Sequence, residues 1–193
     1  MNLKAPEDEV ACPECASGRM FTDMRTLITS LVLTAFAFSS HAGAAPKVPR
    51  KAAEFVIQTP DGKQQLLSSY RGKTVVLALM FTTCPHCQKT AGLLAQVQKE
   101  YANKGVQVLG AAFDQGAAFN IQNFNKVFGV NFPCGYSSQK AVMDFLEITE
   151  PPFVPDLVFI DKTGTIRAQY VGDEKFLSNQ EVNIRAELDK LIR

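Results

Sequence analysis

This sequence has few histidines and no cluster of charge of one sign. The first shortage argues against a metal site and the second against nucleic-acid binding. The 193 residues include two histidines, and 20 Lys and Arg stand against 19 Asp and Glu, which leaves a formal net charge of +1. Because the basic residues are scattered and offset by acids, we expect no nucleic-acid-binding surface. Hydrophobic residues make up 46% of the chain, and no internal repeat or low-complexity block interrupts it, so we expect one folded domain with an appendage.

A hydrophobic run long enough to cross a membrane is also missing near the N-terminus. The uncharged stretch LITSLVLTAFAF, residues 27–38, is twelve residues long, whereas a membrane-spanning helix needs about 20. Arg25 stands before it, and the small residues Ala42, Gly43 and Ala44 follow. This pattern predicts a secretory signal peptide and with it a periplasmic or otherwise extracytoplasmic location. An uncleaved membrane anchor and a buried core helix are the alternatives.

The segment ahead of this stretch does not fit a signal peptide. Met1–Asp23 is acidic and lacks helical or strand periodicity, whereas a signal peptide begins close to its basic residues. We therefore expect translation to start at Met20 or Met24. The predicted division is a leader at residues 1–45 and a folded domain at residues 46–193.

Strands and helices alternate along the predicted domain. The continuous apolar run TVVLALMF, residues 74–81, is typical of a strand that is buried on both faces. Apolar residues at helical spacing follow from Pro85, and Gly105 supplies a stop. Further strands are predicted at 106–113, 132–134, 157–160 and 165–170, further helices at 119–128, 141–146 and from about Asn179, and a strand–turn–strand unit at 55–70. This alternation predicts an α/β domain with a mixed sheet and helices on both of its faces.

Two cysteines, Cys84 and Cys87, directly follow the predicted buried strand. A Cys-x-x-Cys pair beside alternating strands and helices is typical of a thioredoxin-like redox site. We expect Cys84 to cap the following helix, where unpaired N–H groups and the helix dipole stabilise the reactive thiolate. Pro85 fits the first helical position, and Cys87 lies one turn further in, near enough to form a disulfide with Cys84. We therefore predict Cys84 as the nucleophile and Cys87 as the resolving sulfur.

His86, which stands between the two cysteines, is predicted to tune their redox potential together with Pro85. A partly protonated imidazole beside Cys84 adds positive charge that favours the thiolate. A favoured thiolate stabilises the reduced form and makes the pair a stronger oxidant. The alternative is that His86 is a solvated spacer.

Metal binding is the first rival interpretation of the cysteine pair. Structural zinc needs four ligands. The cysteines and histidine available after residue 46 are Cys84, Cys87, Cys134 and His86. Cys12 and Cys15 precede the predicted signal peptide, and Gln88 stands where the Cys-x-x-Cys-His haem motif needs histidine. We expect no metal and no other cofactor, and an inert structural disulfide is the alternative to a redox role.

Three sequence blocks match one known family. They are TVVLALMFTTCPHC at 74–87, VNFPCGYSSQKAVMDFLEI at 130–148 and VPDLVFIDKTGTI at 154–166. With them, the sequence from about Ala53 to Arg193 resembles the extracytoplasmic thioredoxin-like family of the TlpA or redoxin type. The dipeptide Pro85-His86 is also the one found in periplasmic disulfide oxidases.

The resemblance implies a thioredoxin-like fold in which the 130–148 block is inserted before a cis-proline. Pro155 matches that cis-proline, which would pack opposite the Cys84–Cys87 disulfide, and Val154 would offer its backbone to an extended substrate chain. An ordinary trans loop proline is the alternative. The implied activity is disulfide exchange with protein thiols and disulfides and with a redox partner protein. We expect a monomer that meets the membrane only if the signal peptide stays as an anchor.

This chain has uncharged residues at two positions where members of the resembled family carry an acidic residue. Thioredoxins carry a buried acid six residues before the first cysteine, where this chain has Ala78. Some reductases carry a glutamate three residues after the second cysteine, where it has Thr90. Such carboxylates move protons for the resolving cysteine, so their absence favours an oxidase or a slow exchanger. The alternative is that water or another side chain moves the proton.

Two function classes follow from these residues. The leading one is a thiol–disulfide oxidoreductase of undetermined direction. The rival is a thioredoxin-like module that binds a partner or a metal and holds an inert disulfide. A peroxiredoxin is disfavoured because Leu77 and Phe81 occupy the Pro and Thr positions of its motif. Cys134 is predicted to be a buried apolar residue, with a second resolving or regulatory thiol as the alternative.

Overall fold

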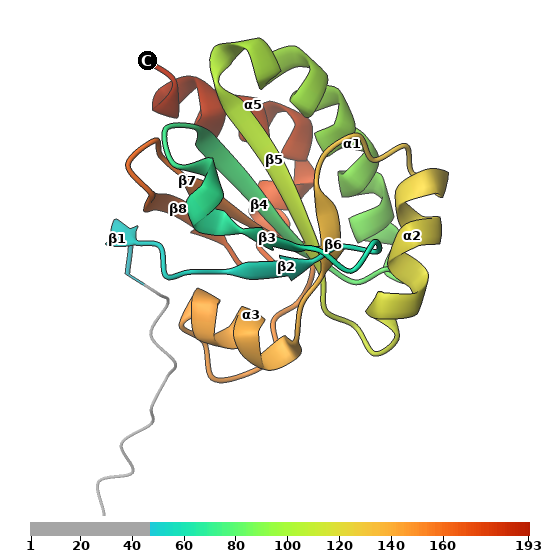
Figure 1. Cartoon of the computed structure of the whole chain (residues 1–193). Coiled ribbons are helices and arrows are strands. Elements are labelled where there is room, and N and C mark those ends of the chain that lie inside the picture. The colour runs from blue at the N-terminus through green and yellow to red at the C-terminus, as the bar shows by residue number, and fades with distance from the viewer. Residues whose placement is uncertain (1–46) are drawn as a thin grey trace, which may run out of the picture. The chain divides into compact units, whose positions relative to one another are not determined.

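The computed structural model describes residues 47–193, which alternate strands with helices (Figure 1). The strands are β1 (Arg50–Lys51), β2 (Val56–Gln58), β3 (Gln64–Leu66), β4 (Thr74–Met80), β5 (Val106–Ala112), β6 (Cys134–Tyr136), β7 (Asp156–Ile160) and β8 (Thr165–Tyr170). The helices are α1 (Pro85–Tyr101), α2 (Ala117–Val127), α3 (Gln139–Leu146), α4 (Glu174–Ser178) and α5 (Gln180–Leu191), with 3-10 turns η1 (Leu67–Tyr70) and η2 (Ala102–Lys104). The predicted leader, with its signal peptide and start residues, lies outside the described residues. Within residues 47–193, no helix has the length and apolar character needed to cross a membrane.

In the described part of the chain, the strands form one mixed sheet in the order β1-β8-β7-β4-β5-β6-β2-β3. β4 and β5 run parallel at its centre, and β7 runs antiparallel to β4. Every residue of β4 is buried, as expected for a strand covered on both faces. The register places Met80 beside Ala112 of β5 and Leu79 beside Asp156 of β7. The end of β4 therefore meets the start of β7.

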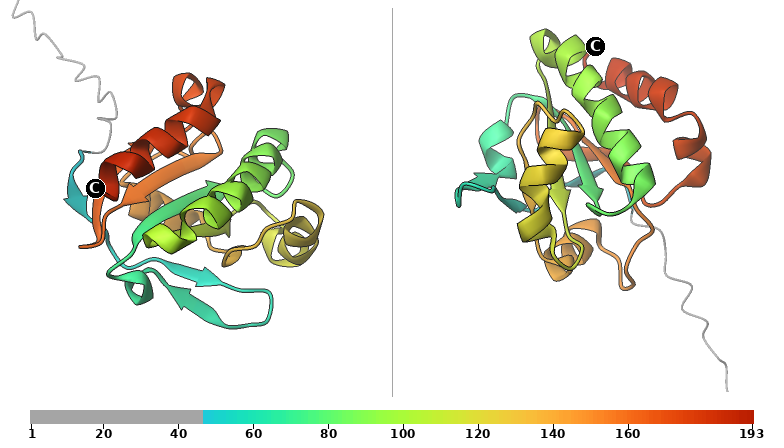
Figure 2. Two further views of the ribbon diagram at one scale, coloured as in Figure 1. Left: turned by 90° about the horizontal axis from the view of Figure 1, so that it is seen from above. Right: turned by 90° about the vertical axis from the view of Figure 1, so that its right-hand side faces the viewer.

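Helices lie on both faces of the sheet (Figure 2). Two apolar cores, one on each face, hold them against it. On one face, Val76 and Ala78 of β4 belong to a core shared with α1, α2 and α5. On the other face, Leu77 and Leu79 belong to a core shared with Phe145 of α3. The β4 side chains alternate between the cores because an extended chain has a period of two. The predicted mixed sheet with helices on both faces is confirmed.

The structure differs from the sequence-based expectation at β1, β6 and α4. β1, a two-residue strand that pairs with β8, was not predicted. β6 begins at Cys134 instead of ending there, because Pro133 has no N–H for a strand ladder and pairing with β5 starts at the next residue. No sequence pattern predicts α4, which has five residues. Asp173 caps this helix by accepting the backbone N–H of Phe176 at 2.9 Å, and Phe176 is buried. A helix this short has too few turns to show a periodic pattern.

Candidate active site

The two cysteines of the Cys-x-x-Cys motif lie at the junction between β4 and α1. Cys84 is the N-cap of α1, with an extended backbone (φ −81°, ψ 122°), and Pro85 opens the helix. The helix starts here because proline fits where a helical N–H has no partner, and the Gln88 N–H donates to the Cys84 carbonyl oxygen at 3.0 Å. Both sulfurs are free thiols in the structure. It therefore describes the reduced pair, and the Cys84–Cys87 disulfide stays a prediction.

The two sulfurs have different surroundings. Cys84 is half-buried, whereas Cys87 is 0% exposed in the core beneath α1. Burial raises the pKa of the Cys87 thiol far above its usual range; the backbone N–H of Phe81 opposes this shift, while Cys84 and Asp156 add to it. That N–H donates to Cys87 Sγ at 3.4 Å. Of this pair, Cys84 is the sulfur within reach of a substrate, and Cys87 holds its proton tightly.

A loop far along the chain completes the site. The Val154–Pro155 peptide bond is cis, as the resemblance implies. The Val154 carbonyl oxygen accepts a hydrogen bond from Cys84 Sγ at 3.9 Å, across 70 positions of sequence. Pro155 is buried and Val154 is half-buried. The structure therefore brings the predicted substrate-binding pair next to the predicted nucleophile.

Side chains from two neighbouring elements hold the loop that leads into Cys84. Asp114, just after β5, accepts the backbone N–H and the hydroxyl of Thr82 at 2.7 and 2.6 Å. The Gln88 side-chain amide donates to the Thr82 carbonyl oxygen at 3.2 Å. These three bonds fix the loop before a substrate arrives. No sequence motif marked Asp114; the available signal was its place after a parallel strand, where site residues collect at the carboxyl edge of a sheet.

The two positions at which the family resemblance implies a proton-moving acid serve packing in this chain. Ala78 and Thr90 are both buried. The Thr90 hydroxyl lies 2.9 Å from the His86 carbonyl oxygen and 2.7 Å from the Gln180 side-chain oxygen, so it ties α1 to α5. Neither side chain is a carboxylate that could take the proton of Cys87.

One carboxylate is nevertheless buried at the site. Asp156 directly follows Pro155 and is 0% exposed. Its Oδ1 accepts the backbone N–H of Gly172 at 2.7 Å, and its buried Oδ2 has no hydrogen-bond partner. Burial raises the pKa of Asp156 to about 8, although the Gly172 N–H favours the ionised form. No motif marked Asp156, but an acid inside the run VPDLVFI was a signal, because a buried unpaired charge is costly.

A pocket of about 440 Å³ opens next to this loop. Its lining includes His86, Val154, Glu174 and Leu177, together with Phe153. The Phe153 ring is 87% exposed, and His86 is also exposed. The surface around the nucleophile is therefore open and partly apolar, and the imidazole stands at its wall. The predicted tuning role of Pro85 and His86 stays a prediction.

The third cysteine of the described residues, Cys134, belongs to β6 and not to this group of residues. It is 4% exposed, and burial raises the pKa of its thiol to about 12. In the sheet register it lies beside Gly110 of β5. The predicted burial of Cys134 is confirmed.

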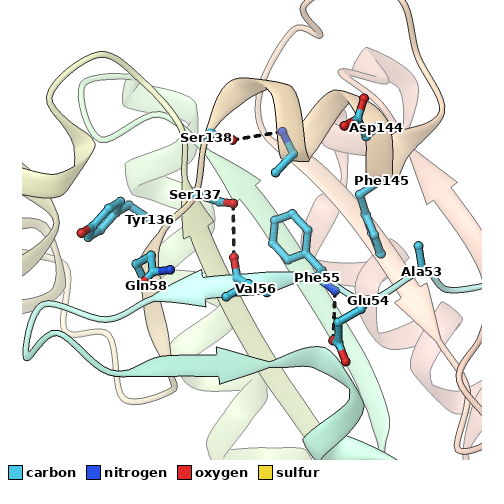
Figure 3. A pocket seen from close by; sticks show the side chains of 11 residues that line it. Ala53, Glu54, Phe55, Val56, Gln58, Tyr136, Ser137, Ser138, Asp144 and Phe145 are labelled. Atoms are coloured by element: carbon cyan, nitrogen blue, oxygen red, sulfur yellow. Dashed lines mark hydrogen bonds between the residues drawn. The ribbon is translucent and has the colours of Figure 1, made fainter.

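A second hollow, of about 550 Å³, lies between β2 and α3 (Figure 3). Polar groups on its wall are already engaged with each other. Ser137 Oγ donates to the Val56 carbonyl oxygen at 3.2 Å, and Glu54 accepts the Phe55 N–H at 3.0 Å. No cysteine lines this hollow, so it is not part of the site around Cys84 and Cys87. Among residues 47–193, no three His, Cys, Asp or Glu side chains form a group that could hold a metal ion.

The site has one accessible sulfur, a buried second sulfur one helical turn away, and the carbonyl of the residue before a cis-proline beside the first sulfur. These features define a class of protein. Together with the fold, they are those of a thioredoxin-like thiol–disulfide oxidoreductase of the redoxin type, and comparisons with known proteins confirm this class. The chain belongs to the AhpC/TSA family, whose model matches residues 48–169.

Individual relatives agree with this placement. The chain is similar to the thiol-disulfide oxidoreductase ResA of Geobacillus thermodenitrificans, with 27% identity over 154 residues that cover 77% of this chain and 86% of the relative. ResA of Bacillus subtilis is 30% identical over 101 residues, which cover 52% of this chain and 56% of that protein. In structure, the chain is similar to a thiol:disulfide interchange protein from Chlorobium tepidum, with a TM-score of 0.64 and 23% identity over 77% of this chain and 100% of that one.

Proposed function

We propose that this protein exchanges disulfides with protein substrates outside the cytoplasm, with Cys84 as the nucleophile and Cys87 as the resolving sulfur. The observation that carries the proposal is the contrast between the half-buried Cys84 at the start of α1 and the buried Cys87 one turn further. A substrate disulfide can be attacked by a sulfur that it can reach. The buried sulfur meets only a disulfide already formed on Cys84.

The exchange then runs in two balanced steps. The Cys84 thiolate attacks a substrate disulfide, a Cys84–substrate bond forms, and the other substrate sulfur leaves as a thiolate. Cys87 next attacks Cys84 Sγ, the Cys84–Cys87 bond forms, and the second substrate sulfur leaves. The substrate gains two electrons and the cysteine pair loses them; a redox partner protein restores the pair. In the reverse direction, the same steps oxidise a substrate dithiol.

The cis-proline loop is the proposed substrate-binding element. The Val154 carbonyl oxygen lies 3.9 Å from Cys84 Sγ, so a chain that pairs with the Val154 backbone would present its own cysteine to this sulfur. The neighbouring pocket, with the exposed Phe153 ring at its wall, leaves room for the side chains of such a segment. Pro85 and His86 are the proposed tuning residues at the start of α1.

Trapping tests the proposed roles. Cys87→Ser should accumulate mixed disulfides with protein substrates through Cys84, because the resolving step is gone, and insulin reduction should stop. Cys84→Ser should trap nothing, and Cys134→Ala should behave like the parent protein. A protein in which Cys84→Ser is the trapping variant has the roles reversed. If neither the parent nor any variant reduces insulin or refolds reduced RNase, the protein is a binding module with an inert disulfide.

The proposed location has its own test. The N-terminal sequence of the exported protein should begin near residue 46, and that of the precursor should begin at Met20 or Met24. A precursor that begins at Met1 contradicts the proposed start. An exported protein that keeps residues 27–38 is anchored by them.

A further inference from the structure

The N–H group that contacts the resolving sulfur belongs to the loop between β4 and α1. Phe81, the first residue after β4, donates its backbone N–H to Cys87 Sγ at 3.4 Å. Burial, Cys84 and Asp156 raise the pKa of the Cys87 thiol, whereas this N–H lowers it. Because the thiolate is the species that attacks a disulfide, a donor aimed at Cys87 favours the form that the resolving step needs.

Two consecutive peptide units set the direction of this N–H. The unit that contains it also contains the Met80 carbonyl oxygen, which accepts the Phe113 N–H at 3.1 Å. The next unit joins Phe81 to Thr82, and its carbonyl oxygen accepts the Cys84 N–H at 3.3 Å. A peptide unit is planar, so a partner at one end of it also restricts the other end. The remaining end of the second unit is the N–H of Thr82.

Asp114 binds that N–H. Its Oδ1 accepts the Thr82 N–H at 2.7 Å, and its Oδ2 accepts the Thr82 hydroxyl at 2.6 Å. Thr82 is 6% exposed, and Asp114 is half-buried. Hydrogen bonds to an ionised carboxylate are stronger than those between neutral groups. Asp114 also directly follows Phe113, whose N–H holds the Met80 carbonyl, so the residues just after β5 hold both peptide units in place.

We propose that Asp114 is a positioning residue for the resolving step, because it keeps the Phe81 N–H aimed at Cys87 Sγ. The inference deepens the proposed function and rests on it. Asp114 acts through Thr82 and Phe81 and takes no part in forming or breaking a bond. Without its two hydrogen bonds, the Phe81–Thr82 peptide unit can rotate and the N–H can move away from the sulfur.

The negative charge of Asp114 would act in the opposite direction to this positioning. A nearby negative charge disfavours a thiolate, so loss of the charge alone would favour the Cys87 thiolate and speed the resolving step. Loss of the positioning would slow that step. The two effects differ in sign, so the rates of suitable variants can separate them.

The two chemical steps can be timed separately with dithiobis(nitrobenzoate), an aromatic disulfide. Attack by Cys84 releases one coloured thiolate at a rate that grows with the reagent concentration. Attack by Cys87 on the mixed disulfide releases the second, at a rate that does not depend on that concentration. The reduced parent protein should carry Cys134→Ala, so that only the active-site thiols report. In stopped-flow traces from pH 6 to 9, its second phase should accelerate with pH as the Cys87 thiolate fraction rises.

Asp114→Ala removes both hydrogen bonds to Thr82. We expect a first phase close to the parent's and a second phase slowed by about tenfold, which is the effect of losing one hydrogen bond to an ionised group. The pH profile of the second phase should move by about one unit toward alkaline pH. Asp114→Asn should restore part of the rate, because its amide oxygen can still accept the Thr82 N–H and its amide nitrogen can donate to the hydroxyl oxygen.

Thr82→Val tests the same contact without a change of charge. It removes the hydroxyl bond and keeps the backbone bond, so the second phase should slow by less than in Asp114→Ala. Thr82→Ser, which keeps the hydroxyl, should restore most of that loss. Asp144→Asn removes a carboxylate from the exposed surface of α3 and should change neither phase.

Each contrary outcome has a separate meaning. If Asp114→Ala and Asp114→Asn speed the second phase equally, the charge of Asp114 is what matters and the inference is wrong. It is also wrong if Asp114→Ala keeps the parent's second phase and pH profile, or if both phases slow to the same extent. Should Asp114→Ala not fold, Thr82→Val decides, because a second phase at the parent rate contradicts the inference. If the parent lacks either phase, the proposed roles of Cys84 and Cys87 are wrong.

Discussion

Cys87 and Cys134 are buried thiols of the same apolar core, yet their neighbourhoods differ in kind. Burial is the main cause that raises the pKa of Cys87 and the whole cause for Cys134. Cys87 also has a backbone donor, a second sulfur and a buried carboxylate within interaction range. Cys134 has Gly110 packed directly against it. The difference teaches that burial makes a thiol inert by itself, and that neighbouring groups decide whether its proton can leave.

The largest expected effect is in alkylation, which compares the three thiols directly. In the native reduced protein at pH 7, iodoacetamide should modify Cys84 at least about 100-fold faster than Cys87 or Cys134. Access and thiolate fraction both favour Cys84, because the other two are buried and their pKa values are raised. Time-resolved peptide mass mapping measures the three rates. In denaturant the three rates should converge, and equal rates in the native protein would remove the distinction between accessible and buried sulfurs.

The second largest expected effect is on the free energy of unfolding and concerns the buried carboxylate of Asp156. Asp156 has a pKa of about 8 in the folded protein, against about 4 in an unfolded chain. Between these values the folded protein binds more protons than the unfolded chain, so the contribution of Asp156 to stability falls as the pH rises through this window. Asp156→Asn removes the titration. The variant should therefore gain roughly 2–5 kcal/mol relative to the parent between pH 4 and pH 8.

Urea unfolding at the two pH values measures this gain, and Asp144→Asn on the exposed face of α3 is the matched control. A stability difference between Asp156→Asn and the parent that is equal at pH 4 and pH 8 would mean that Asp156 is ionised in the folded protein throughout.

The sequence predicted the features that depend on local patterns. It did not predict those that depend on how distant segments pair. The strand TVVLALMF, the helix start at Pro85 and the Cys84–Cys87 spacing are local patterns, and each lies where it was expected. The cis bond at Pro155 was available through the family resemblance alone. Asp114 and Asp156 depend on how strands pair, since β5 and β7 flank β4 from opposite sides. The spacing of residues along the chain does not show which strands pair. The hydrogen bonds of Asp114 and the burial of Asp156 could therefore be recognised only in the structure.

The smallest expected effect is on stability and concerns Gly110, which packs against Cys134. A Cβ at Gly110 would lie 2.6 Å from Cys134 Sγ and 3.2 Å from Phe132 Cε2, and β5 is held between β4 and β6 and has little room to shift. Gly110→Ala should therefore overpack this spot and cost about 1–3 kcal/mol of unfolding free energy, measured by urea unfolding. Combining it with Cys134→Ala removes the obstructing sulfur, so the double variant should recover part of the loss and show coupling between the two sites. Insulin reduction should stay at the parent rate in the folded variants, because no group of the Cys87 neighbourhood is altered. If Gly110→Ala slows insulin reduction while the protein stays folded, the two buried thiols are linked through β5, and the functional separation between them fails.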